Sequence, residues 1–504
     1  MSQIKTGAII SYIGLFINIL IGLVYTPWMI NEIGQSDYGL YTLAMSIIGL
    51  LAFDFGLGNA TTKYICQYLA ENRQDKVDNL LGLIYKLYLI VDVFLIIVLS
   101  IIYLFLPEIY TGLTDKEIAR FSRVFLIAAL FCVISFPFIP LNGILSSYEK
   151  FVPLKLCDIF NKVFIVLTMT ACLLFGLGLY ALVLVNSIAG ILTIIAKLYI
   201  VKKQTPVKLN WSFKDKSLLK DIGIFIAWVS VAAIAQRCIF NIAPSILGIL
   251  SDSTSIAIFG VAITLEGYVY LFANAINGMF LPRVSRFLNS NNQNEILELM
   301  IKVGRIQIYI VGFIIILLIS IGQHFISVWI GEGYKSVYPC LLLIVLPSFL
   351  HLPQEIGHTC VIAANKVKKQ AIVFICMAIV NIALSIPLTQ KWGVLGMSIS
   401  IFIAYIVRTI GLDIIFYKDL HIDVLKFFRK SYGALILPLL IVCTCAIIIN
   451  HTVPGIGYAS LIIKGILITL VFGFVMYCMS MNKYEKDLIL VPIKKILNLD
   501  SNVQ

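Results

Sequence analysis

The stretch YGLYTLAMSIIGLLAFDFGLGNATTKY, residues 38–64, decides the fold. Its apolar run is long enough to cross the hydrocarbon core of a bilayer as a helix, which takes about 20 residues. It lacks the period-two alternation that a barrel strand would show. The stretch therefore predicts a transmembrane helix, and Asp54 lies within it between two phenylalanines.

The composition of the whole chain agrees with this stretch. Of 504 residues, 60% are hydrophobic and only 13% are charged, and the mean hydropathy is +0.98. A soluble domain carries roughly a quarter of charged residues to cover its surface. The composition therefore predicts an all-α integral membrane protein. No secretory cleavage site follows the first apolar segment, so we expect that segment to remain in the mature protein.

A scan with a span length of about 20 residues predicts fourteen transmembrane helices. Their approximate ranges are 7–31, 39–60, 80–106, 122–147, 155–175, 178–200, 220–249, 255–281, 300–322, 337–363, 369–388, 392–416, 431–450 and 457–481.

Lysine and arginine gather at one set of helix ends, most densely in VKKQTPVKLNWSFKDKS, residues 201–217. This bias predicts that these ends, and both termini, are cytoplasmic. The same bias explains the net charge of +12, because lysine and arginine at these ends set the topology and contact anionic lipids. The positive charge therefore does not indicate a nucleic-acid partner, and we expect none. The eleven cysteines include no C-x-x-C pair, and they are expected to pack as small apolar residues.

Three weak internal matches recur at separations of 210 to 221 residues. DYGLYTLAMSI around Gly39 matches IFGVAITLEGY around Gly260, FPFIPLNG matches LPSFLHLP, and FGLGLYA matches WGVLGMS. They predict two six-helix lobes related by a pseudo-two-fold axis along the membrane normal, plus two extra C-terminal helices. The predicted parts are an N-terminal lobe 1–202, a cytoplasmic linker 203–217, a C-terminal lobe 218–417, extra helices 418–481 and a cytoplasmic amphipathic tail 482–504.

The segment IGLVYTPWMINEIGQSDYGLYTLAMSIIGLLAFDFGLGNATTKYI, residues 21–65, resembles the N-terminal signature of polysaccharide-synthesis export proteins. These are the Wzx-type O-antigen and capsule repeat-unit flippases of the MOP superfamily, which also holds MATE drug exporters and murein-precursor flippases. The resemblance implies a V-shaped two-lobe transporter of the bacterial cytoplasmic membrane. It would carry an oligosaccharide linked through pyrophosphate to a polyprenol from the inner to the outer leaflet. The resemblance also implies no enzymatic activity and no cofactor, with membrane lipids, a polysaccharide polymerase and chain-length proteins as further partners.

Three alternatives remain open at this stage: a MATE-like cation-coupled exporter of small drugs or metabolites, a lipid II flippase, and a polytopic glycan polymerase. The polymerase is disfavoured because its chemistry needs an organised site, usually on a large outer loop. The longest outer connections, 107–121 and 323–336, are too short for one. The absence of a P-loop disfavours ATP hydrolysis. A cation exporter would need carboxylates in its cavity, whereas an anionic glycolipid would need Arg and Lys.

Charged residues inside the spans are costly, so each should have a partner or a wet cavity. Asp54 and Lys86 each lie sixteen residues from position 70, so an antiparallel hairpin would place them at equal depth as a pair. Alternatively, Lys86 could snorkel to the surface and Asp54 could cap or kink its helix.

Arg237 and Glu266 each lie about fourteen residues from the turn at Ser251 and Asp252, and we expect them to meet near the midplane. They could form a buried structural ion pair. Alternatively, Arg237 could bind a pyrophosphate or an acidic sugar, and Glu266 could release it or take up a proton.

Three further charges complete the set. Arg408 is a second candidate for binding an anionic head group, or an anchor at the helix end. Lys162 belongs to the same cationic set, although Asp158 lies four residues before it and a local pair is expected. Asp92 has no obvious cation at its depth, so a protonated carboxyl is an alternative. Asp92 and Asp54 join Glu266, His351, Glu355 and His358 as candidates for coupling or charge relay.

The tenth span carries His351, Glu355 and His358 on one helical face. One helix cannot complete a metal shell and no second ligand set exists, so a polar cavity wall or a proton-linked site is favoured and no metal is predicted. Four prolines interrupt the fourth and tenth spans and are the predicted hinges: Pro137, Pro140, Pro347 and Pro353.

Overall fold

The computed structural model describes residues 3–51, 57–213, 228, 230–274, 284, 287, 293–364 and 366–496. Every regular element within these ranges is helical, which confirms the predicted all-α class. Asp54 lies outside the described residues, so its predicted pairing with Lys86 stays a prediction.

The chain packs as two compact units. Unit 1 comprises Met1–Ile263 and Val367–Ala404, and unit 2 comprises Thr264–Lys366 and Tyr405–Gln504. Unit 1 thus includes segments that the repeat assigns to the second lobe. The grouping reflects packing within the units, and the predicted lobe boundaries remain a prediction.

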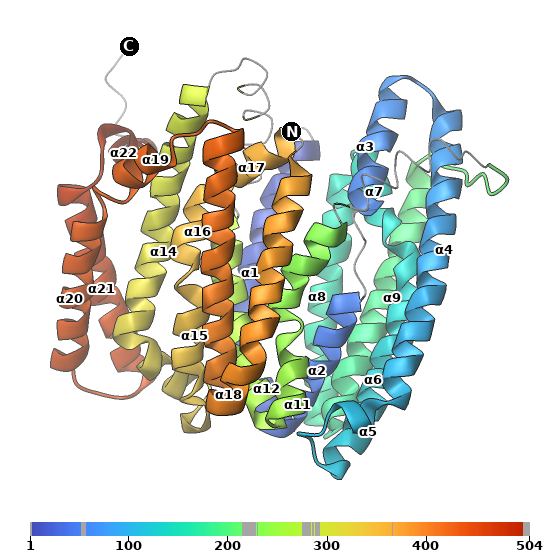
Figure 1. Ribbon diagram of the computed structural model, residues 1–504, viewed down its shortest axis with the longest axis horizontal. Helices are drawn as coiled ribbons and strands as arrows, with labels where there is room; N and C mark the ends of the chain where they lie inside the picture. The colour runs from blue at the N-terminus through green and yellow to red at the C-terminus, as the bar shows by residue number, and fades with distance from the viewer. Residues whose placement is uncertain are drawn as a thin grey trace. The chain divides into compact units, whose positions relative to one another are not determined.

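Unit 1 holds the N-terminal helices and the start of the predicted second repeat (Figure 1). Its elements are α1 (Gln3–Ile33), α2 (Gln35–Leu51), α3 (Leu57–Ala70), α4 (Gln74–Leu104), α5 (Leu106–Ile109), α6 (Asp115–Ser135), η1 (Phe136–Phe138), α7 (Pro140–Ser147), α8 (Phe151–Leu174), α9 (Gly178–Gln204), α11 (Ala243–Leu250) and parts of α12 (Ser253–Asn274) and α18 (Val367–Asp419).

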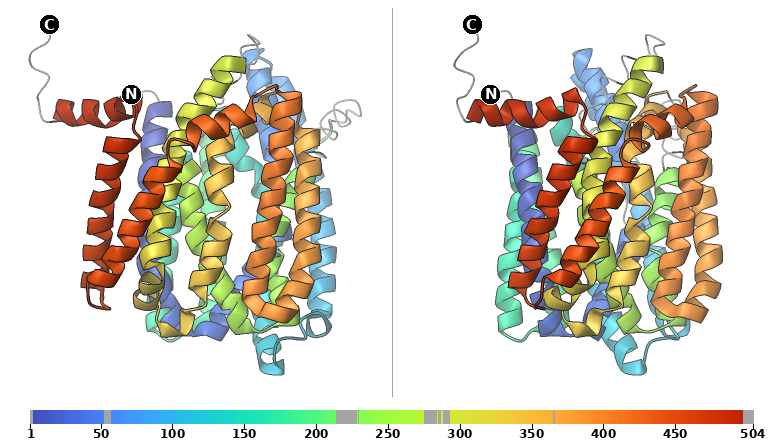
Figure 2. Two further views of the ribbon diagram at one scale, coloured as in Figure 1. Left: turned by 60° about the vertical axis from the view of Figure 1, so that its left-hand side comes forward. Right: turned by 90° about the vertical axis from the view of Figure 1, so that its left-hand side faces the viewer.

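Unit 2 holds the rest of α12 and α18 together with the C-terminal helices. Its further elements are α14 (Gln293–Trp329), η3 (Glu332–Tyr334), α15 (Val337–Val345), α16 (Ser348–His351), η4 (Leu352–Gln354), α17 (Glu355–Ala363), α19 (Val424–Ser431), α20 (Ile436–Thr452), α21 (Tyr458–Met479) and α22 (Lys483–Ile496). In both views of Figure 2, α20 and α21 run side by side and α22 turns away from the end of α21.

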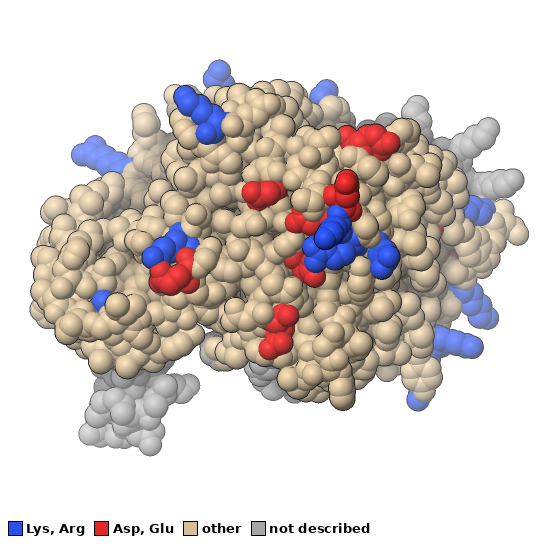
Figure 3. All heavy atoms as spheres, turned by 90° about the horizontal axis from the view of Figure 1, so that it is seen from below, with Lys and Arg blue, Asp and Glu red and all other residues tan. Residues whose placement is uncertain are grey.

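Nine helices in the described part of the chain are long and apolar enough to cross a membrane, or up to 11 if each of two bent pairs is one span. Helix α18 counts once here, but its backbone leaves helical geometry at Gly393 (φ 56°, ψ −133°), so it consists of two helices joined across a kink, which correspond to the two predicted spans 369–388 and 392–416. Figure 3, a view onto the helix ends, shows Lys, Arg, Asp and Glu in a few small groups on an otherwise tan surface. The protein is therefore a multi-pass membrane protein.

The predicted hinge prolines coincide with breaks in two helices. Helix α6 ends at Ser135, and α7 begins at Pro140 after the short 3₁₀ turn η1. In unit 2, α15 gives way after Val345 to three short elements, α16, η4 and α17. Proline has no backbone N–H to donate and its ring clashes with the preceding turn, which explains the breaks.

Within unit 1, helix α2 packs closely against the first part of α12. A Cβ on Gly39 would lie 2.1 Å from the Ser253 carbonyl oxygen, and one on Gly260 would lie 2.8 Å from Thr42 side-chain atoms. Gly39 and Gly260 are the two residues that the internal repeat matches. Each lets its own helix approach the other, because neither position has room for a side chain.

Polar contacts reinforce this packing at the start of both helices. Ser36 Oγ donates to Glu117 Oε1 at 2.7 Å, and Ser253 Oγ lies 3.1 Å from Ser36 Oγ and also donates to Glu117. Arg120 forms an ion pair with Asp37 at 2.5 Å. Helices α2, α6 and α12 are thereby joined at one end of unit 1.

Two buried polar contacts link the C-terminal helices of unit 2. Lys464 of α21 donates from Nζ to Asn450 Oδ1 of α20 at 3.0 Å. Arg305 of α14 binds Glu485 of α22 through two hydrogen bonds, Nε to Oε1 at 2.5 Å and Nη2 to Oε2 at 2.9 Å. Such bidentate pairs are among the stronger hydrogen-bonded contacts.

Candidate functional site

A group of buried polar side chains in unit 2 lies where the broken tenth span meets α18. His351 of α16 stacks on Tyr405 of α18, with ring centroids 5.0 Å apart and an interplanar angle of 17°. The Arg408 guanidinium lies over the same Tyr405 ring at 5.7 Å from its centroid. One aromatic ring therefore contacts both an imidazole and a cation.

Arg408 is only 6% exposed, so it does not reach the surface as an anchor at a helix end would. It interacts electrostatically with His351 and Glu355. The sequence had placed Arg408 in one candidate set and the span-ten residues in another. The structure brings these candidates into one cluster.

Glu355 and His358 form the second contact of this cluster. His358 Nδ1 lies 3.0 Å from Glu355 Oε1, and both side chains are largely buried. Among the described residues, no group of three or more His, Cys, Asp or Glu side chains is placed to hold a metal ion. The arrangement can bind an anion through Arg408 or exchange a proton through the imidazoles and the carboxylate.

Glu266 and Arg237 fall in different units, so their pairing stays a prediction. Glu266 is buried in the unit 2 part of α12, with 6% exposure. Arg237 is half-buried in unit 1, and its Nη1 donates to the Gly49 carbonyl of α2 at 2.5 Å. Asn241, one turn later, donates to the Ser46 carbonyl of the same helix at 3.4 Å.

Lys86 contacts the linker that follows α9. Its Nζ donates to the Phe213 carbonyl at 3.0 Å. Nearby, the Asn210 backbone N–H donates to the Asp78 carbonyl at 3.2 Å and the Trp211 ring contacts Tyr85. The first part of the linker therefore lies along α4.

Lys162 does not form the local pair that the sequence suggested. Within the described residues, Asp158 pairs instead with Lys197 at 3.0 Å and with Lys155 at 3.6 Å. The expectation was wrong because Lys197 of α9, distant in sequence, reaches Asp158 from the facing helix. Lys162 itself is exposed. Asp92 is buried in α4, and its Oδ1 has no hydrogen-bond partner among the described residues.

Sequence reasoning missed two residues of these clusters. Tyr405 carries no charge and lies in an apolar run, so nothing in the sequence distinguished it. Lys197 lies close to the lysines that the charge bias places at the cytoplasmic helix ends, yet it is buried. The sequence did contain a signal: Lys197 lies six residues before Lys203 and therefore further inside the predicted span.

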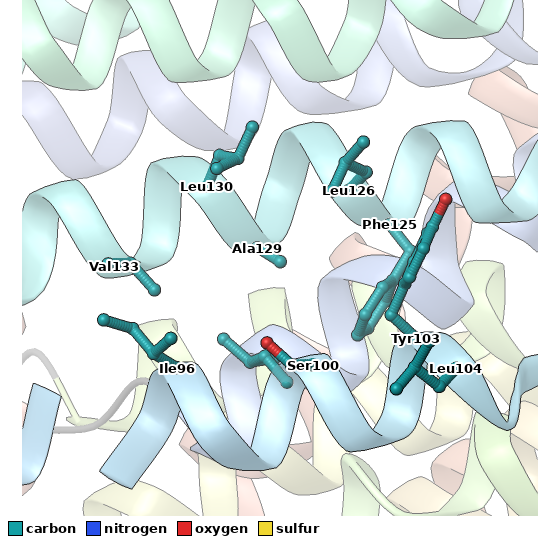
Figure 4. A pocket seen from close by; sticks show the side chains of 10 residues that line it. Ile96, Ser100, Tyr103, Leu104, Phe125, Leu126, Ala129, Leu130 and Val133 are labelled. Carbon is teal, nitrogen blue, oxygen red and sulfur yellow. The ribbon is translucent and has the colours of Figure 1, made fainter. Parts of the chain in front are cut away.

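An apolar pocket of about 380 Å³ lies between α4 and α6 in unit 1 (Figure 4). The side chains of Ile96, Ala129 and Val133 line it from the two helices, and Ser100 and Tyr103 are its polar residues. Among the described residues, no Lys, Arg, Asp, Glu or His lines this pocket. Its chemistry suits hydrocarbon rather than a charged group.

Known proteins resemble this chain in sequence. The family model described as "Polysaccharide biosynthesis protein" matches residues 4–288, more than half of the chain. A protein of Escherichia coli (strain K12) named "Putative O-antigen transporter" is 22% identical over 395 residues, which cover 76% of this chain and 89% of that protein.

Two solved structures share the fold. "Lipid II flippase MurJ, inward closed conformation" aligns with a TM-score of 0.68 at 16% identity, over 94% of this chain and 98% of that one. An inward-facing multidrug resistance MATE family transporter of the MOP superfamily aligns with a TM-score of 0.67 at 15% identity, over 80% of this chain and 95% of that one. The predicted MOP fold is therefore confirmed. By the match of its first 288 residues, the chain belongs to the polysaccharide biosynthesis protein family.

Proposed function

We propose that the protein moves a lipid-linked oligosaccharide, joined through pyrophosphate to a polyprenol, from the inner to the outer leaflet of the bacterial cytoplasmic membrane. Membership of the polysaccharide biosynthesis family supports a glycan substrate, and the name of the Escherichia coli relative supports transport of such a glycan. The transport is by alternating access, both termini are cytoplasmic, and a polysaccharide polymerase and chain-length proteins act on the exported unit.

The buried guanidinium of Arg408 is the observation that carries this proposal. Keeping a charge inside a membrane protein is costly, and such residues commonly mark a substrate path. A guanidinium offers five N–H donors in a planar fork that matches the oxygens of a phosphate. Tyr405 and His351 beside it supply an aromatic surface and further polar atoms for a sugar.

Glu355, His358, Glu266 and Asp92 are the proposed coupling groups, and Arg237, Lys86 and Lys162 are the further proposed contacts for the anionic head group. Flexure at the broken fourth and tenth spans, which contain the four prolines, would let the cavity change the side to which it opens.

A gene deletion tests the proposal. In the deletion strain, lipid-linked repeat units should accumulate on the inner leaflet, and a plasmid copy of the gene should restore their export. If deletion left the repeat units unchanged and raised susceptibility to cationic drugs, the function would instead be that of a MATE-like exporter. The structural likeness to a MATE transporter is the observation that favours this second candidate.

Substitution of Arg408 sharpens the test. Arg408→Gln should lower export about 10- to 100-fold, because a hydrogen bond to a charged group contributes about 1.5–3 kcal/mol. Arg408→Lys should retain part of the activity, since it keeps the charge but not the fork. Lys418→Gln, on an exposed residue of the same helix, should export normally. Equal export by Arg408→Gln and Lys418→Gln, at equal protein levels, would contradict a role for the guanidinium.

A further inference from the structure

Unit 1 contains a polar cavity of about 520 Å³ among α6, η1, α7, α8 and α9. It lies wholly within one unit and is separate from the Arg408 cluster of unit 2. Its polar wall is formed by Ser135, Asn142, Asp158, Asn161, Lys162 and Lys197. The remaining lining residues are apolar apart from Thr193, and they include Phe131, Phe138 and Ile194.

Lys197 is the central charge of this cavity. It is only 9% exposed, so its ammonium points inward, whereas lysines near helix ends commonly snorkel toward the headgroups. Its Nζ donates to Asn142 Oδ1 at 2.9 Å and to Asp158 Oδ1 at 3.0 Å. An ammonium has three N–H donors, so one remains for a ligand in the cavity.

The charge balance of the cavity is positive. Of the described residues that line it, Asp158 is the one carboxylate, against the two ammonium groups of Lys162 and Lys197. Lys155, which does not line the cavity, also pairs with Asp158 at 3.6 Å and shares its negative charge. An anion in the cavity would therefore meet two cations and one partly neutralised carboxylate.

The depth of the cavity suits a lipid phosphate. Asp158 lies seven residues after the start of α8, and Lys197 lies seven residues before the end of α9. At 1.5 Å per residue, both lie about 10 Å from these helix ends. A 27-residue helix such as α9 is about 40 Å long, the thickness of a bilayer with its headgroups. The two charges then lie just inside the headgroup layer.

We infer that this cavity binds the phosphate group of an anionic lipid, with Lys197 and Lys162 on the phosphate oxygens and the apolar wall against the adjoining chain. The phosphate could belong to a membrane phospholipid or to a polyprenyl pyrophosphate, and the binding chemistry is the same. The inference shares Lys162 with the proposed contacts for the substrate head group, but no residue of the Arg408 cluster takes part, so a failure at one site does not decide the other.

Native mass spectrometry of the full chain in neutral detergent tests the inference. The probes are dioleoyl phosphatidylglycerol, undecaprenyl pyrophosphate, and dioleoylglycerol as a lipid without phosphate. We expect saturable binding of at least one phosphate-bearing probe and none of dioleoylglycerol at the same concentration. Tighter binding of phosphatidylglycerol assigns the site to membrane lipid, and tighter binding of the pyrophosphate assigns it to a carrier lipid.

The variants separate this site from surface charge. Lys197→Gln and Lys162→Gln should each weaken binding at least fivefold. Lys202→Gln, which removes an exposed cation from the same helix α9, should leave binding unchanged. Asp158→Asn should strengthen binding about threefold or more, because it frees Lys197 for the ligand.

Two outcomes would overturn the inference. The first is an equal, small loss of binding in all three lysine variants, which would indicate non-specific attraction to the surface. The second is weaker binding in Asp158→Asn together with a lower melting temperature, which would indicate that Asp158 and Lys197 form a structural pair only. Lys162 is exposed, so the Lys162→Gln protein should fold. This variant therefore still tests the inference if the Lys197→Gln protein does not fold.

Discussion

Gly190 of α9 keeps the polar cavity open because it has no side chain. A Cβ at this position would lie 2.2 Å from Cζ and 2.6 Å from Cε2 of Phe131, a residue of α6. Both residues line the cavity. The Phe131 ring can therefore rest on the α9 backbone, and the space beside it stays open.

Gly190→Ala should force the Phe131 ring off α9 and into the cavity. Overpacking of this kind costs about 1–3 kcal/mol, so we expect a lower melting temperature in detergent together with weaker binding of the phosphate-bearing lipid. Gly473→Ala is the matched control, since nothing lies within 4 Å of a Cβ there and alanine is the better helix former by about 1 kcal/mol. If the Gly190→Ala protein were as stable as the control, the Phe131 ring would be able to move without overpacking, which would contradict the prediction.

At the scale of elements, α22 is fastened to α14 by a buried and well-satisfied ion pair. Glu485 accepts hydrogen bonds from Arg305, from the Tyr309 hydroxyl at 3.0 Å and from the Asn482 backbone N–H at 2.9 Å. Asn482 Oδ1 accepts in return from the Glu485 backbone N–H at 2.9 Å, which completes a cap at the start of α22. The cap and the ion pair use the same carboxylate.

This contact predicts an acid-sensitive attachment of α22. Burial alone would raise the pKa of the Glu485 carboxyl, but the hydrogen bonds from Arg305 and Asn482 outweigh it and hold the pKa below the ordinary 4.5. A lowered pKa in the folded state contributes stability that is complete above the ordinary value and is lost as the pH falls through the folded value. Between pH 7 and pH 3.5, the wild-type melting temperature should therefore approach that of Glu485→Gln.

The control for this prediction is Glu332→Gln, which removes an exposed carboxylate paired with Lys335. Exposed pairs contribute little to stability, so this variant should follow the wild type at every pH. A constant difference between wild type and Glu485→Gln across the range would mean that the carboxylate charge does not hold α22.

The elements were largely predictable from the sequence, and the contacts between them were not. Hydropathy located α4, α8, α9 and α21 because a span needs about 20 apolar residues wherever it lies. The same rule separated the two helices that meet at Gly393 within α18, but it could not reveal that Lys197 points inward, nor which cation pairs with Asp158. Such features depend on which helices become neighbours. Tyr405 meets His351 only because α18 packs beside the broken tenth span within unit 2, whereas Arg408 reaches Tyr405 from three residues further along the same helix.

At the scale of the whole molecule, the proposed alternating access predicts that the contact of α2 with α6 and the start of α12 opens during the cycle. The predicted topology places this end outside the cell. Backbone packing at Gly39 and the hydrogen bonds of Ser36, Glu117 and Ser253 hold it closed in this structure.

A disulfide across this contact should stop transport. Ser36 Oγ and Ser253 Oγ are 3.1 Å apart, so the Ser36→Cys, Ser253→Cys double variant should form a cross-link under mild oxidation. Export of repeat units should then fall to the level of the deletion strain and return after reduction. Each single variant, oxidised in the same way, should export normally and controls for the native cysteines. Normal export by the fully cross-linked protein would mean that α2 and α12 stay together throughout the cycle.

The hydrogen bond between Lys464 and Asn450 bears on how the chain is assembled during synthesis. If helix α21 entered the bilayer alone, its Lys464 would have no partner. Inserting a lysine costs about 2.5–3.5 kcal/mol at the centre of a span, and this cost is smaller near the end of the span. Asn450 is available as soon as α20 has left the ribosome, since it precedes Lys464 by only fourteen residues. The last two spans should therefore be delivered to the lipid together as a hairpin, with the ammonium already covered.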